Sequence, residues 1–141
     1  MTHDLPEGYT IASEQPSVAD YRRLRRNAGL SPKSAEAGAA GLPNTWHAVV
    51  VRHCDAGVVG MGRIVGDGGL FFFIVDIAVE PAHQGRGLGK AIMAGLMTHL
   101  RANGPASAHV GLFADGEAHR LYARFGFKPT APESIGMALV L

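Results

Sequence analysis

The residues with the clearest capacity for chemistry are the seven from Gln84 to Lys90, which read Gln-Gly-Arg-Gly-Leu-Gly-Lys. Three glycines in five residues let the backbone approach a ligand closely, because no Cβ atom stands in the way. An apolar run at helical spacing follows, and the first N–H groups of a helix lack internal partners and carry the positive end of its dipole. Arg86 and Lys90 add positive charge. The segment therefore predicts an anion site, with a plain glycine-rich connection as the alternative.

Two common phosphate-binding motifs do not fit this segment. A Walker loop needs a glycine, four further residues and then Gly-Lys-Ser/Thr, whereas Gln84 takes the first position here and Ala91 follows the lysine. A dinucleotide loop needs G-x-G-x-x-G, and Lys90 stands in place of its third glycine. What remains is Q-x-x-G-x-G, shortly after an apolar run that ends at Val79.

This pattern resembles the acyl-CoA signature of the GNAT superfamily of acyl-CoA-dependent N-acetyltransferases. Residues 121–127, Leu-Tyr-Ala-Arg-Phe-Gly-Phe, resemble that family's Leu-Tyr-x-x-x-Gly-Phe segment and follow in the right order. The two matches cover roughly residues 70–128, and the N-terminal half matches only in its general layout. The resemblance implies an enzyme that moves an acetyl group from acetyl-CoA directly to a primary amine.

The resemblance also implies how the chain would hold its co-substrate, acetyl-CoA. The glycine-rich backbone would bind the pyrophosphate, and the strand end would hold the thioester arm, with a free N–H near Val79 polarising the carbonyl if the strand splays. The residues assigned to acetyl-CoA are Ile77, Ala78, Val79, Gln84, Gly85, Arg86, Gly87, Leu88, Gly89, Lys90 and Asp115. Asp115 stands where the family often has asparagine. It can accept the same hydrogen bond but cannot donate one, and capping the next helix is its alternative role.

Two residues are assigned to proton transfer. Tyr122 is the expected proton donor to the departing thiolate, since a phenol is protonated at neutral pH; the alternative is a core tyrosine. Asp76 is the expected general base, because burial of a lone carboxylate in an apolar strand would raise its proton affinity. Its alternative is a buried aspartate paired with a backbone donor or an arginine, and Glu80 or a water chain could then serve as base.

The amine acceptor is less defined. Asp76 and Glu80 would suit a cationic amine or polyamine, whereas an aromatic and aliphatic pocket would suit an arylalkylamine. The residues expected to line that pocket are Tyr21, Leu30, Trp46 and Phe73. The expected acceptor is thus a small-molecule amine. Acetylation of a protein amino group, or a non-catalytic acyl-CoA-binding or sensor module, are the alternatives.

Composition narrows the possible partners. With 141 residues, 47% hydrophobic, the chain can build its own core, and its net charge of +1 gives no electrostatic case for nucleic acid. No apolar run reaches the ~20 residues of a membrane span, and the N-terminus lacks a signal-peptide core. The single cysteine, Cys54, fits a reducing compartment, so the sequence predicts a cytoplasmic protein. No metal is expected, because the seven histidines lack ligand spacing and His53 and Cys54 should point apart.

Periodicity predicts one α+β domain over residues 1–141, with a GNAT-like, mixed and mostly antiparallel sheet of six to seven strands flanked by about four helices. A parallel pair is expected at the acyl-CoA site. The expected strands cover residues 9–14, 45–53, 58–65, 70–79, 109–113, 127–130 and 136–141. Ser17 and Ser31 should each begin a helix, and Arg22 to Arg26 should form a solvated face or a rim that steers an anionic ligand. A homodimer through the edge of the C-terminal strands is left open.

Overall fold

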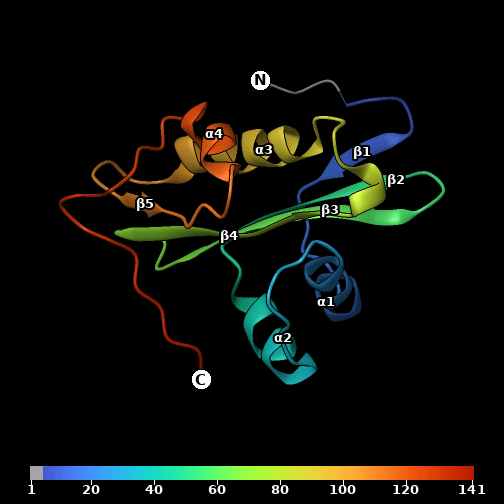
Figure 1. Ribbon diagram of the computed structural model, residues 1–141, viewed down its shortest axis with the longest axis horizontal. Coiled ribbons are helices and arrows are strands. Elements are labelled where there is room, and N and C mark those ends of the chain that lie inside the picture. Colours follow the sequence, from blue (N-terminus) through green and yellow to red (C-terminus); the bar gives the residue numbers. More distant parts are fainter. Residues whose placement is uncertain (1–4) are drawn as a thin grey trace.

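The computed structural model describes residues 5–141 and contains one five-stranded sheet with helices on both faces (Figure 1). In chain order the elements are β1 (Tyr9–Ala12), α1 (Val18–Asn27), α2 (Ala35–Gly41), η1 (Leu42–Asn44), β2 (His47–His53), β3 (Gly57–Gly66), β4 (Phe71–Val79), η2 (Pro81–His83), α3 (Leu88–Asn103), β5 (His109–Gly111) and α4 (Ala118–Ala123). The strand order is β1-β2-β3-β4-β5, antiparallel throughout except for the parallel pair β4–β5. Figure 1 shows α3 and α4 on one face and α1 and α2 on the other.

The predicted mixed, mostly antiparallel sheet with a parallel pair is confirmed, but the prediction of six to seven strands is wrong. The closing strands expected at residues 127–130 and 136–141 are not formed in the described chain. Pro129 and Pro132 have no N–H to donate to a ladder, and no backbone hydrogen bond joins residues 136–141 to the sheet. Their apolar side chains, including Leu139, stay exposed.

Serine caps set the two helix starts on the α1 face. The Ser17 side chain accepts from the Asp20 N–H at 3.1 Å, so α1 begins where the sequence predicts. The second helix begins at Ala35 rather than beside Ser31, because Ser34 is its cap. Ser31 is engaged elsewhere, since its carbonyl and hydroxyl oxygens both accept from the guanidinium of Arg25.

The sheet separates two apolar clusters, which explains how it holds helices on both faces. The cluster between α3 and the sheet includes the strand residues Val49, Val51, Val59, Ile64 and Phe72, together with Ile92 and Leu96 of α3. Beneath α1 the buried residues include Tyr21, Leu24, Leu42, Val50, Met61 and Ala78. Gly62 lets α3 lie close to the sheet, because a Cβ there would be 2.5 Å from Ile92 Cγ2. Consecutive β2 residues alternate between the two clusters, which is the period of a strand in a sheet covered on both sides.

A bulge in β4 changes which face its side chains point to. Ile74 lies in the cluster under α3, yet Ala78, four residues later, lies in the cluster under α1. An unbroken strand would put both on one face. The register against β3 shifts between Met61 and Arg63, and Asp76 has a left-handed φ of 62°. The extra residue therefore turns the end of β4 over and points Asp76 toward α1.

Beyond the bulge the sheet opens between its two parallel strands. β5 pairs with β4 only opposite Phe71–Phe73, so within residues 5–141 no strand pairs with residues 74–79 on that edge. The Glu80 N–H donates to the Val59 carbonyl at 2.8 Å. Because antiparallel N–H groups alternate in direction, the Val79 N–H points away from β3 and into the open side. This splay is the feature on which the candidate site is built.

Candidate active site

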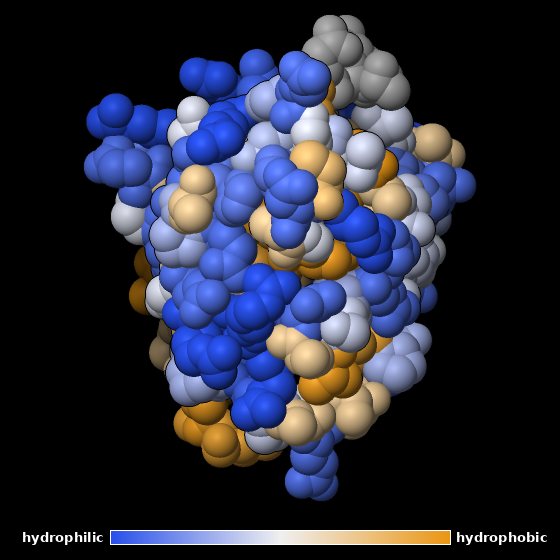
Figure 2. Space-filling view, turned by 90° about the vertical axis from the view of Figure 1, so that its right-hand side faces the viewer, coloured by the Kyte–Doolittle hydropathy of each residue, from blue (hydrophilic) through white to orange (hydrophobic). Residues whose placement is uncertain are grey.

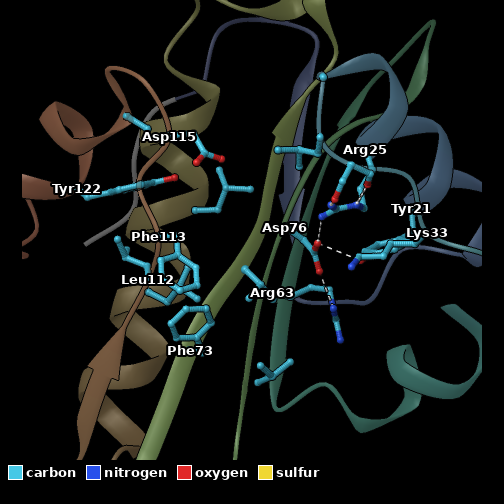
Figure 3. Close-up of a pocket in the computed structure, with 18 residues that line it drawn as sticks. Tyr21, Arg25, Lys33, Arg63, Phe73, Asp76, Leu112, Phe113, Asp115 and Tyr122 are labelled. Atoms are coloured by element: carbon cyan, nitrogen blue, oxygen red, sulfur yellow. Dashed lines mark hydrogen bonds and ion pairs between the residues drawn. The ribbon is translucent and has the colours of Figure 1, made fainter. Parts of the chain in front are cut away.

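A cavity of about 690 Å³ lies in the gap between β4 and β5 and joins the two faces of the sheet (Figure 3). On one side it is bounded by α1, the loop after it and the sheet, and on the other by β5, the loop after it and α4. Its lining includes Tyr21, Arg25, Leu30, Lys33, Arg63, Phe73, Asp76, Ile77, Phe113, Asp115 and Tyr122. The predicted acceptor residues Tyr21, Leu30 and Phe73 therefore share one space with the predicted proton donor.

Asp76 is held by three donors and is nearly inaccessible to water. Arg25 Nη1 donates to Oδ1 at 2.6 Å, Arg63 Nη1 donates to Oδ2 at 2.6 Å, and the Tyr21 hydroxyl donates to Oδ1 at 2.9 Å. The side chain of Asp76 is 5% exposed, and those of the two arginines are 10% and 9% exposed. Burial, together with the charge of Asp76 and the hydrogen bond to it, raises the pKa of Tyr21 to about 12. This matches the alternative in which the aspartate is paired with arginine.

The second carboxylate near the strand end is also engaged. Glu80 accepts from Arg23 and from Asn27 Nδ2, the latter at 3.1 and 3.0 Å. Arg23 and Arg25 therefore do not form the solvated face expected for this helix, because each is ion-paired with a carboxylate of the β4 region. The role of Asp76 as a base stays a prediction, and its three donors weaken it, since a proton would have to displace an arginine.

Tyr122 faces the cavity from α4, on the wall opposite Asp76. Figure 3 shows its hydroxyl directed toward Asp115. Burial, and then the negative charge of Asp115, raise the pKa of Tyr122 above its ordinary value of 10.0. Both causes favour the protonated phenol, so Tyr122 is ready to donate a proton at neutral pH. Its assignment as the acid remains a prediction that this environment supports.

The backbone of β4 offers the donor expected for a carbonyl. The Val79 N–H points into the splay, and Ile77 lines the cavity directly. Ala78 is buried under α1, so any contact with a ligand would come from its backbone. Gln84 Nε2 donates to the Val79 carbonyl at 3.0 Å, which ties the glycine-rich loop to the strand end.

The glycine-rich loop ends in an open helix N-terminus. Gly85 and Gly87 have left-handed φ values of 76° and 81°, and no heavy atom lies within 4 Å of a Cβ built at either. Gly87 is the N-cap of α3, and no side chain caps the helix. Leu88 is buried and anchors the first turn, while Lys90 is exposed. The free N–H groups at this end therefore suit an anion.

Arg86 is held beside the loop by an aromatic pair. Its Nη1 donates to the Tyr9 hydroxyl at 3.1 Å, and that hydroxyl lies 2.6 Å from Nδ1 of His83. The end of the molecule that carries η2 and the β2–β3 turn is mainly hydrophilic, with apolar side chains showing between polar ones (Figure 2). A charged, water-soluble ligand fits such a surface.

One predicted acceptor residue is in the wrong place. Trp46 packs on Phe72 and His99, with ring centroids 4.6 and 5.1 Å apart, and so lies on the α3 face. Trp46 does not line the cavity, because β2 begins only at His47 and strand alternation does not extend to the residue before it. Conversely, sequence reasoning missed Arg25, Lys33 and Arg63. Arg63 had a signal, since it is the only charge in the apolar strand β3.

The expectation that His53 and Cys54 point apart is also wrong. β2 ends at His53, and in the following turn the ligand atoms of His53, Cys54 and Asp55 lie within 4.8 Å of one another. This is the one group of three such residues in the described chain that could hold a metal ion. It lies in a turn outside the cavity.

Among residues 5–141, no helix has the length and apolar character needed to cross a membrane.

Comparisons with known proteins agree with this geometry. Residues 45–129 match the family model described as an acetyltransferase (GNAT) domain. The solved structure of a Staphylococcus aureus protein of unknown function, described as a probable acetyltransferase, is 42% identical with a TM-score of 0.89, covering 94% of this chain and 99% of that one. A histone acetyltransferase of Glycine max is 30% identical in an alignment of 128 residues that covers 84% of this chain. A serotonin N-acetyltransferase of Oryza sativa subsp. japonica is 35% identical over 80 residues, 57% of this chain.

This chain spans only 54% and 39% of the length of those two plant relatives, whose names give different acceptors. The family model covers more than half of the chain and includes the loop, the splayed strand and Tyr122. The chain therefore belongs to the GNAT family of acetyltransferases.

Proposed function

We propose that this protein transfers the acetyl group of acetyl-CoA to the primary amine of a small molecule within a ternary complex. The observation that carries the proposal is the cavity through the splay, which brings the open β4 edge and Tyr122 into one space with the residues of α1. Acetyl-CoA would enter from the α3 side, with its pyrophosphate at the N-terminus of α3. The acceptor would enter from the side of α1 and α2. Cytoplasmic location and a homodimer stay predictions.

The transfer itself needs little beyond placement. The amine nitrogen attacks the thioester carbonyl carbon while the Val79 N–H stabilises the developing oxyanion. The C–N bond forms, the C–S bond breaks, and the thiolate takes the phenolic proton of Tyr122. The nitrogen loses its proton to water, which returns one to the tyrosine. The products are the N-acetylated amine and free CoA thiol, so no oxidant or metal is required.

The amine must be neutral when it attacks. Two arginines lie beside the cavity and neutralise Asp76, so the net field around an incoming amine is positive. A positive surrounding disfavours the ammonium form and favours the neutral amine. A strong base is then unnecessary, and Asp76 acts by positioning Arg25, Arg63 and Tyr21.

The test is release of free thiol from acetyl-CoA in the presence of a panel of primary amines. We expect Tyr122→Phe to lower kcat by about 10²-fold while acetyl-CoA affinity, measured by calorimetry, is unchanged, since only the proton is removed. Phenylalanine keeps the ring that packs beside the cavity, so a folding defect is not expected. Unchanged turnover would remove Tyr122 from the acid role. Acetyl-CoA binding without thiol release for any amine would leave the chain as a non-catalytic binding module.

A further inference from the structure

The acceptor side of the cavity carries more positive than negative charge. Arg25, Lys33 and Arg63 line it together with a single carboxylate, Asp76. The other carboxylate of the cavity, Asp115, lies on the opposite wall beside Tyr122 (Figure 3). Asp76 therefore compensates one of three cations, and a positive field remains where the acceptor would bind.

Several of the donors on this wall are not used by the protein. Arg63 donates through Nε to Thr45 Oγ1 at 2.9 Å and through Nη1 to Asp76, but within residues 5–141 its Nη2 donates to no protein atom. Every enclosed side-chain nitrogen or oxygen of the described chain has a hydrogen-bond partner, so Arg63 Nη2, which has none, is not fully enclosed by protein. Lys33 Nζ makes no ion pair or hydrogen bond in the same part of the chain, although Arg22 Nε fixes its backbone by donating to its carbonyl at 2.9 Å.

Lys33 and Arg63 line the same two spaces. Lys33 and Arg63 line the main cavity and also a smaller hollow of about 230 Å³ under α2, with Tyr21 between the two spaces. Arg63 is held in place by Thr45 and Asp76, so its unused Nη2 is preorganised rather than mobile. A carboxylate or phosphate can accept one charge-assisted hydrogen bond from Nη2 and another from the ammonium of Lys33.

We infer that the acceptor is a primary amine that also carries an anionic group, a carboxylate or a phosphate, which binds Arg63 Nη2 and Lys33 Nζ. This inference rests on the proposed transferase function and narrows its substrate class. A polyamine does not fit, because its second ammonium would meet two uncompensated cations while Asp76 and Glu80 are already paired. The amine end of such a molecule would extend toward the splay, and its anionic end would lie under α2.

The experiment compares acceptors that share a three-carbon skeleton and differ in charge at the far end. They are 1,3-diaminopropane, propylamine, 3-aminopropanoate and 3-aminopropylphosphonate, assayed by thiol release at constant ionic strength. We expect at least one anionic acceptor to exceed propylamine in kcat/KM by about tenfold or more, and the diamine to be the poorest. Comparison of 3-aminopropanoate with 3-aminopropylphosphonate shows which anion the site prefers. The difference in kcat/KM between the anionic acceptors and propylamine should shrink as salt is added, because ions screen the attraction to Arg63 and Lys33.

Lys33→Met tests the assignment, since Lys33 makes no ion pair within the described chain and its loss should not unfold the protein. In this variant the ratio of kcat/KM for the anionic acceptor to kcat/KM for propylamine should fall about tenfold. The fall should come from a higher KM for the anionic acceptor and not from a lower kcat. Arg26→Met is the matched control, because it removes one charge from the exposed side of α1 outside the cavity and should leave the ratios unchanged.

Two outcomes overturn different claims. Thiol release that is equal for propylamine and the anionic acceptors, or that favours the diamine, refutes the anionic class and leaves the transferase function standing. If no thiol is released with these amines or any other, the transferase function is refuted. In that case the anion site is tested by titrating 3-aminopropylphosphonate into the CoA complex. Saturable binding that Lys33→Met weakens supports the anion site, and absence of binding refutes the anion site.

Discussion

The ion-pair network around Asp76 makes a sharp prediction about stability. Asp76→Asn removes one negative charge and leaves Arg25 and Arg63 buried beside each other without compensation. The backbone should tolerate the change, because asparagine adopts the left-handed conformation of this position about as well as aspartate does. The loss of folding stability in Asp76→Asn is therefore expected to be electrostatic, with no contribution from backbone strain.

The magnitude follows from the exposure of the groups. Breaking one buried pair typically costs about 3–5 kcal/mol, and side chains only 5–10% exposed qualify as buried. The asparagine oxygen can still accept from one arginine, whereas its NH₂ group would face the other arginine, donor against donor. We therefore expect a loss at the lower end, about 3 kcal/mol. For a domain of this size that corresponds to a fall in Tm of roughly 10 °C.

Urea-induced and thermal unfolding, followed by circular dichroism, measure this loss. Glu117→Gln is the matched control: it breaks the exposed pair with Arg120, whose side chains are 78% and 74% exposed, and should cost no more than about 0.5 kcal/mol. If Asp76→Asn and Glu117→Gln lose equally little, with an unchanged urea dependence, the claim that Asp76 holds the two arginines together is wrong.

Two further predictions concern the donor half of the site. Gly87→Val should abolish acetyl-CoA binding in calorimetry, because a β-branched residue is strained at a φ of 81° and its side chain blocks the helix N-terminus. Gly57→Val is the control: its φ is 73° and the space around it is equally open, so it should carry the same strain and keep the affinity for acetyl-CoA. The high-pH loss of kcat should lie above pH 10, because burial and the charge of Asp115 raise the pKa of Tyr122 and the protonated phenol is the active form. In Asp115→Asn that loss should move to lower pH, and an unmoved profile would show that another group controls it.

Local patterns located the secondary-structure elements of the predicted donor half. Glycine spacing and helical period located the loop and α3, and the buried apolar run located β4, because these signals are written in neighbouring residues. The acceptor half depends on contacts between distant residues. Arg25 stands four residues after Tyr21, so helical period puts it on the buried side of α1, but Asp76 lies 51 residues further along the chain and the sequence does not show that the two side chains meet. The bulge at Asp76 was not visible either, since a register shift depends on pairing with β3 rather than on composition.

The connection between β1 and β2 has a consequence for how acceptor choice can change. These neighbouring antiparallel strands could be joined by a tight hairpin, yet the chain leaves the sheet after Ala12 and returns only at His47. Everything that α1, α2 and their loops bring to the acceptor wall, including Arg25 and Lys33, arrives in this single excursion. We expect that this excursion can be exchanged as one segment without altering the glycine-rich loop or Tyr122, which lie outside it. A grafted segment that supplies a cation for Asp76 should then change the proposed acceptor specificity.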